Sequence, residues 1–254
     1  TGFDYAGADF GGGLASEYLH TQGANRGRSG HFRTDFVSLS AYGTYLPPDL
    51  KELSFYAIGG AGYVSSRFHR EAGPSGSTIP AIAKPNGLEA TAVLGAEFTF
   101  AKEMFTRIPE GFSLTPLANL QYVWNQLESF REHGAGVYDL KAGSQIANSL
   151  SSLLGTRADY FFETNSVALN TEFDLGWRHE FLNGPRHVTL ATPNFTQIQT
   201  LSSQYVGVAR TTLWIGVDFL LTVYRSFQLE VSSDLQWNPD YFQNSFYLGL
   251  GGAF

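Results

Sequence analysis

The chain of 254 residues lacks cysteine, contains a single methionine and has few charged residues. Without cysteine it can form no disulfide bond, which fits both oxidising and reducing compartments. Lys, Arg, Asp and Glu make up 15% of the residues, whereas a soluble surface carries roughly 25 to 35%. No run of about 20 apolar residues is present, because Asp218 interrupts the apolar stretch at 211–223. These absences argue against a soluble enzyme core and against a helical membrane span.

The charge balance and the residues that are abundant narrow the class further. The formal net charge of -7 predicts no basic surface, so we expect no nucleic-acid partner. The 28 glycines and 15% aromatic residues favour a chain that meets lipid on one side and packs tightly on the other. The mean hydropathy of -0.12 is too low for a bundle of membrane helices.

Alternation of apolar and polar residues is the strongest pattern in the chain. Between 167 and 181, one face of an extended strand collects the apolar side chains and the other collects ionic ones. The apolar set is Val167, Leu169, Phe173, Leu175, Trp177 and Phe181. The same split predicts strands at 88–100, 112–124 and 227–237. Further strands are predicted at 32–46, 53–68, 149–162, 205–221 and 244–254, of which 53–68 alternates poorly.

The strand lengths and the placement of aromatic residues indicate a membrane barrel. A tilted spanning strand needs about 9 to 11 residues, and many of these runs are longer. Aromatic side chains gather near the strand ends, as in the girdles of spanning barrels. They are Tyr45, Phe100, Tyr122, Trp124, Tyr160, Phe162, Trp177, Phe181, Phe227 and Trp237. Loops near 70–87, 131–146 and 183–204 are predicted to be long and to face outward, which places Phe254 on the periplasmic side.

The opening segment Gly2–His20 is predicted to hold the end of one strand, a turn at Ala6–Asp9 and a full strand. With about nine further strands, the count falls short of the even number that closes a bacterial barrel. We therefore expect at least one strand upstream of Thr1.

Several stretches together resemble one family. They are GFDYAGADFGGGLASEYLH near the start, SLTPLANLQYVWNQLESFREHGAGVYDL followed by NSLSSLLGTRADYFF in the middle, and WRHEF and GLGGAF near the end. In order and spacing they resemble the C-terminal translocator domain of autotransporters, the type V secretion proteins. The resemblance covers essentially the whole chain.

The resemblance implies an all-β fold, a transmembrane antiparallel up-and-down β-barrel of about 12 strands when complete. It also implies a plug helix in the pore and an N-terminal passenger domain. The chain departs from this pattern because the first strand, most of the second strand, the helix and the passenger are missing from it. We expect residues 1–254 to form a single outer-membrane barrel domain of a longer protein.

Charged and polar residues of the alternating strands cannot face lipid, where a charge at the midplane costs roughly 2 to 4 kcal/mol. We predict that they line a lumen. The set is Glu89, Glu97, Arg157, Asp159, Asn170, Glu172, Asp174, Arg178, Arg210, Asp218, Glu230 and Asp234. Two interpretations remain open, namely a hydrated acid-rich conduit that also contacts a plug helix, and salt-bridged filling that stiffens the wall.

The C-terminal stretch FYLGLGGAF places Phe246, Leu248, Leu250 and Phe254 on one face of the last strand. A terminal Phe after alternating apolar residues resembles the signal read by the outer-membrane insertion machinery, which we expect to bind by strand addition at an edge. The alternative is an ordinary last strand.

No catalytic motif accompanies the histidines. His69 and His133 fall near predicted outer loops with Glu71 and Glu132 close by, but no Gly-x-Ser-x-Gly or His-Glu-x-x-His pattern is present. Glu132 matches a Glu-x-Gly-Ala position of the family, and we interpret it as a solvated loop carboxylate. We expect no enzyme activity in this domain and no cofactor or metal.

The leading hypothesis is an autotransporter translocator in the bacterial outer membrane, which anchors and supports export of its own N-terminal passenger. The expected partners are outer-membrane lipid and lipopolysaccharide, the barrel-insertion machinery and that passenger. The alternative is a porin-like channel for small solutes. An outer-membrane hydrolase is a third hypothesis, which would need clustered rim residues.

Overall fold

The computed structural model describes residues 2–24, 30–73, 79–102, 104–182, 186–191, 201–205, 210–224, 227–240 and 242–252, with the side chains of 186–190 and 201–205 left aside. These residues fold almost entirely into antiparallel strands, and a 3-10 turn at Gly136–Tyr138 is the one helical element among them. In this part of the chain, no helix is long and apolar enough to cross a membrane.

Eleven strands follow one another across the main sheet in the order of the chain, and each pairs with its neighbour in antiparallel register. This up-and-down order confirms the predicted fold class. The strands are β1 (Gly2–Ala6), β2 (Phe10–Ala24), β3 (Gly30–Tyr45), β4 (Leu53–Ala72), β6 (Asn86–Phe98), β7 (Phe112–Leu127), β10 (Gln145–Glu163), β11 (Val167–Glu180), β14 (Thr211–Val223), β15 (Phe227–Trp237) and β16 (Phe242–Gly252).

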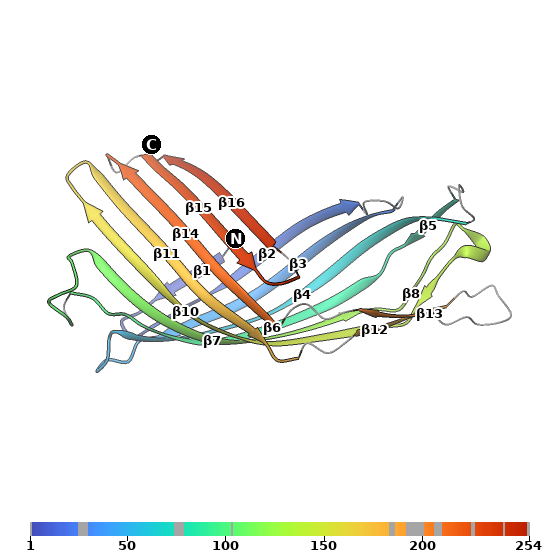
Figure 1. The fold of residues 1–254 in the computed structure, drawn as a ribbon, viewed down its shortest axis with the longest axis horizontal. Helices are drawn as coiled ribbons and strands as arrows, with labels where there is room; N and C mark the ends of the chain where they lie inside the picture. The colour runs from blue at the N-terminus through green and yellow to red at the C-terminus, as the bar shows by residue number, and fades with distance from the viewer. Residues whose placement is uncertain are drawn as a thin grey trace.

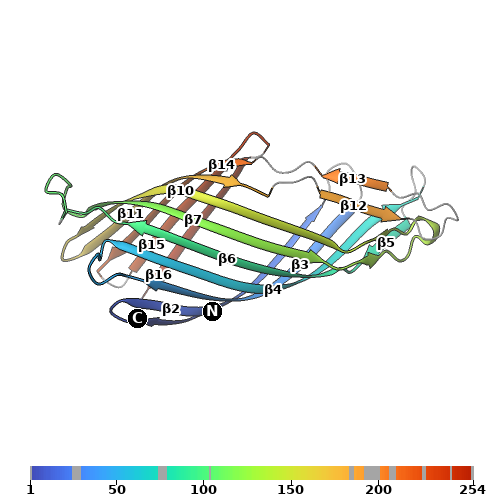
Figure 2. The ribbon, with the colours of Figure 1, turned by 90° about the horizontal axis from the view of Figure 1, so that it is seen from below.

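The sheet is strongly curled, so that its first and last strands approach the same side of the molecule (Figures 1 and 2). Strands β1 and β16 form its two edges, and they are not paired with each other within the described residues. The tight turns at 7–9, 46–52 and 164–166 lie at one end of the curl, together with the end of β16. The connections at 73–85, 128–144 and 181–210 lie at the opposite end, as predicted for the long loops. Two connections depart from a strict alternation: the one at 99–111 lies with the tight turns although it is longer, and the short one at 238–241 lies at the end with the long loops.

The predicted long loops contain strands, which corrects the sequence-based expectation. β4 continues to Ala72 and pairs with β5 (Ile79–Ala83). The other two loops supply β8 (Phe130–Arg131), β9 (Lys141–Ala142), β12 (Arg186–Ala191) and β13 (Leu201–Tyr205), which form a second sheet of four strands. Prolines and polar residues made these segments resemble loops, but edge pairing beyond a membrane tolerates both.

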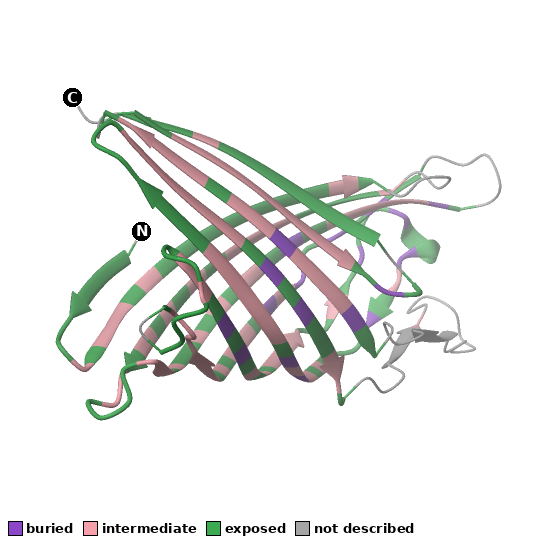
Figure 3. Cartoon of the chain, turned by 60° about the vertical axis from the view of Figure 1, so that its left-hand side comes forward, coloured by how far each residue is buried: buried purple, intermediate pink, exposed green. Residues whose placement is uncertain are grey.

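Alternate residues of a strand point to opposite faces of the sheet, and residues that share a face have the same parity. In the eleven main strands every described buried residue points to one face, and this is the face that carries the polar side chains. Among them are Ser66, Thr115, Ser151, Asp174 and Thr212. Side chains converge on the inside of a curled sheet and spread apart on the outside, so the crowded polar face is the concave one. Figure 3 shows the resulting alternation of exposed and less exposed residues along the strands.

The opposite, convex face is apolar and exposed. Its side chains include Leu94 (64% exposed), Leu120, Leu154, Phe173, Leu175, Trp177 and Leu248. A soluble protein rarely exposes a continuous apolar surface larger than a few hundred Å². The convex face therefore suits a lipid environment, and the strand pairing satisfies the backbone groups that lipid cannot.

Leu94 and Val93 are neighbours on opposite faces of β6, which makes them a matched test of this assignment. Leu94 lies near the middle of the apolar row on that strand. We expect Leu94→Arg to lower the free energy of unfolding by about 2 to 4 kcal/mol in phospholipid vesicles, because the charge enters the hydrocarbon. Val93→Arg should cost about 1 kcal/mol or less. Equal losses in urea titrations of the two variants would contradict the assignment of the faces.

Candidate lumen and its extracellular end

A compact ionic cluster lies on the concave face, where β10 and β11 pair. Arg157 stands directly opposite Asp174, and Asp159 stands opposite Glu172. The Arg157 Nε atom lies 2.9 Å from Glu172 Oε1 and 3.1 Å from Asp174 Oδ1. One guanidinium therefore contacts two carboxylates, of which Asp174 is only 6% exposed. Because charge-assisted hydrogen bonds are stronger than neutral ones, this contact stabilises the pairing of β10 with β11.

Further polar contacts extend the cluster in both directions around the curl. Ser113 donates a hydrogen bond to Asp159 at 3.3 Å, and the Trp214 indole N–H donates to Asp234 at 3.2 Å. Farther along the sheet, the Asn125 amide donates to Glu89 at 3.2 Å. Each of these contacts crosses from one strand to the next, so the polar side chains on this face form hydrogen bonds with one another.

The structure places the sequence-predicted lumen residues as follows. Eleven of the twelve lie within strands at the parity of the concave face, namely Glu89, Glu97, Arg157, Asp159, Asn170, Glu172, Asp174, Arg178, Asp218, Glu230 and Asp234. Arg210 lies just before β14, where its carbonyl accepts a hydrogen bond from the Glu180 amide. That these residues line a water-filled lumen stays a prediction.

Several apolar residues on the concave face escaped the sequence analysis. Trp214, Leu117 and Leu153 have the concave parity, and the latter two are nearly buried. Between 211 and 223 the sequence is apolar on both faces of the strand, so alternation cannot place Trp214. Gly176, directly opposite Trp214, makes room for the indole ring, since a side chain there would meet Trp214 and Leu153 at 3.0 Å. Only the register reveals this packing.

At the end of the curl opposite the tight turns, Arg70 and Glu132 form a bidentate ion pair. Arg70 Nε donates to Glu132 Oε1 at 3.0 Å, and its second nitrogen donates to Glu132 Oε2 and to the Tyr138 carbonyl. The Leu140 amide also donates to Glu132, which is only 7% exposed. The interpretation of Glu132 as a solvated carboxylate is therefore wrong. The hydrogen bond with Glu132 raises the pKa of the Arg70 guanidinium.

The ion pair holds the segment at 128–144 against the β4–β5 hairpin. Ala72, Ala81 and Ala135 pack together as a small buried cluster beside it. The Ala135 amide donates to Asp139 Oδ1 at 2.9 Å, and Ile82 and His133 exchange backbone hydrogen bonds. Small alanines allow the two segments to approach closely, so the part of the chain beyond this end of the main sheet is an ordered unit with a core of its own.

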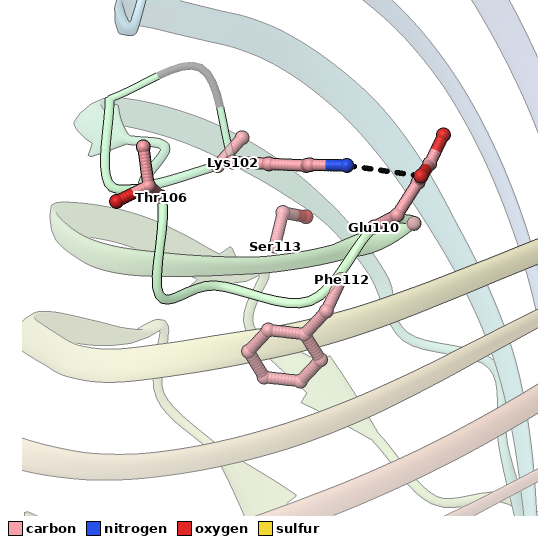
Figure 4. Close-up of a pocket in the computed structure, with 7 residues that line it drawn as sticks. Lys102, Thr106, Glu110, Phe112 and Ser113 are labelled. Atoms are coloured by element: carbon pink, nitrogen blue, oxygen red, sulfur yellow. Dashed lines mark hydrogen bonds and ion pairs between the residues drawn. The ribbon is translucent and has the colours of Figure 1, made fainter.

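At the opposite end, the turn between β6 and β7 surrounds an open recess (Figure 4). The Lys102 ammonium donates to Glu110 Oε2 at 2.9 Å across its mouth, and this hydrogen bond lowers the pKa of the Glu110 carboxyl. Thr106, Phe112 and Ser113 also line the recess. The described lining residues include no histidine, and the charge pair joins the two arms of an exposed turn.

The predicted insertion signal lies at one edge of the sheet. Phe246, Leu248 and Leu250 share the convex face of β16 and are 69%, 57% and 70% exposed. Phe254 lies outside the described residues. β15 pairs with one side of β16, and in the described part of the chain the other side of β16 has no strand partner.

Loss of the Glu132 charge should loosen this ordered unit at the end of the sheet. We expect Glu132→Gln to cost about 2 kcal/mol of local stability, because it leaves the Arg70 guanidinium without its counter-charge. Amide hydrogens of residues 128–144 should then exchange roughly 30-fold faster in mass-spectrometric hydrogen exchange. Glu128→Gln removes the same charge from an exposed position nearby and should leave exchange unchanged. Unchanged exchange in both variants would show that the ion pair does not hold the segment.

Comparison with known proteins agrees with this geometry. Residues 1–234 match the family described as the autotransporter beta-domain. An extracellular serine protease of Serratia marcescens is 28% identical over 145 residues, which are 57% of this chain and 14% of that protein. A second protease of that name from the same species is 29% identical over 142 residues, 56% of this chain and 13% of that protein. The chain thus spans about a seventh of the length of the curated relatives that it matches.

Solved structures share the fold at low sequence identity. The translocator domain of the autotransporter NalP from Neisseria meningitidis superposes with a TM-score of 0.72 at 15% identity, over 100% of this chain and 79% of that one. The transport unit of AIDA-I from Escherichia coli gives a TM-score of 0.63 at 16% identity, over 100% and 80%. Because the family match covers most of the chain, we conclude that it belongs to the autotransporter β-domain family and is an outer-membrane translocator domain of type V secretion.

Proposed function

We propose that residues 1–254 act as one domain, which anchors an autotransporter in the outer membrane and supports export of an N-terminal passenger through or beside its lumen. One observation carries this proposal. A curled sheet presents a crowded polar face inward and an exposed apolar face outward. Such a wall separates lipid from a polar path, which an extended polypeptide needs in order to cross a membrane.

The chemistry of the concave face supports a hydrated path. Acidic residues outnumber basic ones among the predicted lumen residues, and the single charge of Arg157 is shared between Glu172 and Asp174. The other carboxylates retain their demand for water or hydrogen-bond donors, which backbone amides of an unfolded segment can supply. Ion pairs within the wall also stiffen it, so both interpretations of the lumen residues apply at different positions.

The mechanism we propose is non-catalytic. The apolar face anchors the barrel, the polar face hydrates the passing segment, and folding of the passenger outside draws the remainder across. The two Serratia relatives bear the name of an extracellular serine protease. Their similarity supports a secreted passenger here but does not indicate its activity. The family match favours export over the alternative of a solute channel.

Two neighbouring serines allow a direct test, because the chain has no cysteine of its own. Ser232 and Ser233 lie in β15 on the concave and convex faces respectively. In the full-length protein, we expect Ser232→Cys to react with a charged, membrane-impermeant maleimide, and to be protected while a stalled passenger occupies the lumen. Ser233→Cys should react only with a lipid-soluble maleimide, whether or not a passenger is stalled. If a stalled passenger leaves Ser232→Cys labelling unchanged, export does not pass this face.

Outer-membrane lipid, lipopolysaccharide and the barrel-insertion machinery complete the proposed partners. We assign the recognition of the insertion machinery to Phe246, Leu248, Leu250 and Phe254. One side of β16 has no partner strand among the described residues, and its exposed aromatic and aliphatic side chains also support docking by strand addition.

This signal can be separated from simple membrane anchoring. We expect Phe246→Ala to reduce the assembled barrel in cells several-fold, measured as the heat-modifiable fraction on electrophoresis. Uncatalysed refolding of the same variant into phospholipid vesicles should keep most of its yield, because no receptor takes part. Tyr247→Ala alters an aromatic residue on the concave face and should affect neither measurement. Equal losses of folded barrel in cells and in vesicles would show that Phe246 only anchors the strand in the membrane.

A further inference from the structure

Strands β2, β3 and β4 continue beyond the apolar belt on the convex face. Val37 stands between Tyr18 and Tyr63 in the register, and these two tyrosines mark the outer aromatic level of the belt. Ten residue steps separate Tyr45 from Asp35, roughly 34 Å along the strand and about 26 Å along the membrane normal at the usual tilt. Asp35 therefore lies just past an apolar band of about 25 Å.

Above that level the outward side chains become cationic. Arg33 stands directly opposite Arg67. The Ser66 amide donates to the Pro85 carbonyl at 2.9 Å, which continues the register and sets Lys84 opposite Arg67 on the other side. All three side chains have the parity of the convex face and are exposed. Adjacent strands lie about 4.8 Å apart, so three cations form a row roughly 10 Å long.

The next row outward adds two histidines. His31 stands opposite His69, and their rings stack with centroids 4.4 Å apart. Gln22, beside Arg33, is a further hydrogen-bond donor, and an open recess is lined in part by Gln22, His31, Arg33 and Arg67. Donors thus surround the cationic row on two sides.

Few carboxylates lie near this row, and Asp35, on the same face of β3 as Arg33, is engaged in hydrogen bonds. Asp35 accepts hydrogen bonds from Tyr18 and His20 at 2.7 Å each and lies 3.5 Å from Arg33. Glu71 lies two residues farther along β4 than His69, and Glu128 lies just past the end of β7, where its amide donates to the Asn86 carbonyl. Within the described residues, Arg67 and Lys84 form no ion pair.

Like charges directly opposite each other destabilise a sheet. The Arg33–Arg67 pair therefore carries a cost that an anion between the two guanidinium groups would remove. Arginine binds phosphate in a bidentate manner, and clusters of basic residues at membrane surfaces recognise phosphorylated headgroups. The convex parity excludes the lumen as the source of this anion, and the height matches the outer-leaflet headgroups.

We propose that Arg33, Arg67 and Lys84, with His31 and His69 above them, bind a phosphate group of an outer-leaflet lipopolysaccharide. The site requires only that the barrel lies in the outer membrane, and it does not depend on passenger export. The ligand is a lipid phosphate, held by charge-assisted hydrogen bonds while its acyl chains lie against the apolar belt below.

The test uses protein extracted from outer membranes, stripped of bound lipid and placed in phosphatidylcholine vesicles. Binding of bisphosphorylated lipid A is compared with binding of lipid A that has lost both phosphates. Wild type should bind the phosphorylated form roughly tenfold or more tightly, and Arg33→Gln/Arg67→Gln should lose that preference. The control Lys51→Gln/Arg107→Gln removes two exposed positive charges from the opposite end and should keep it.

Heat-modifiable mobility shows that each variant is folded before binding is measured. A second readout is stability in urea. Without phosphorylated lipid, Arg67→Gln should be as stable as wild type or more so, because the like-charge contact is gone, whereas with lipid A it should be less stable. Equal binding of both lipid forms by wild type would overturn the proposal. The proposal would also be overturned if millimolar inorganic phosphate stabilised the protein against urea as strongly as lipid A does. That result would assign the site to free phosphate.

Discussion

The structure depends on one constraint: each strand must place one face against lipid and the other face against ions and water. Backbone pairing satisfies the peptide groups, which leaves the side chains to divide between the two faces. All described buried residues of the main strands lie on the polar face, and large apolar side chains such as Leu94 and Leu154 are exposed on the other. The usual order of a globular protein, with an apolar interior and a polar surface, is therefore inverted.

Arg157 shows how the polar face remains stable without an apolar core. Its guanidinium contacts Glu172 and Asp174, and Gly216 leaves the space that the neighbouring carboxylates require. Beyond this cluster the wall has more acids than bases, so it needs water or a hydrogen-bonding chain beside it. A structural need of the wall thus becomes a property that suits a path for an unfolded polypeptide.

Beyond the membrane the same strands carry different chemistry on their two faces. On the concave side, Arg70 and Glu132 hold the extracellular hairpins together around small alanines. On the convex side, Arg33, Arg67 and Lys84 form the exposed cationic row at headgroup height. Because side chains alternate along a strand, a single continuous ribbon from β2 to β4 can stabilise the extracellular unit and face the lipid headgroups at once.

The sequence by itself determined the fold class, the membrane-spanning strands and the face of most side chains, because alternation with period two is a local property. Eleven of the twelve predicted lumen residues, all but Arg210, lie on the predicted face for this reason. Only the tertiary structure decided what depends on register. It set Arg157 between two carboxylates, turned Trp214 inward, buried Glu132 against Arg70 and aligned Arg33 with Arg67 and Lys84. Pairing between strands that are distant in the sequence brings these groups together, and the sequence of a single strand does not specify its partner or its register.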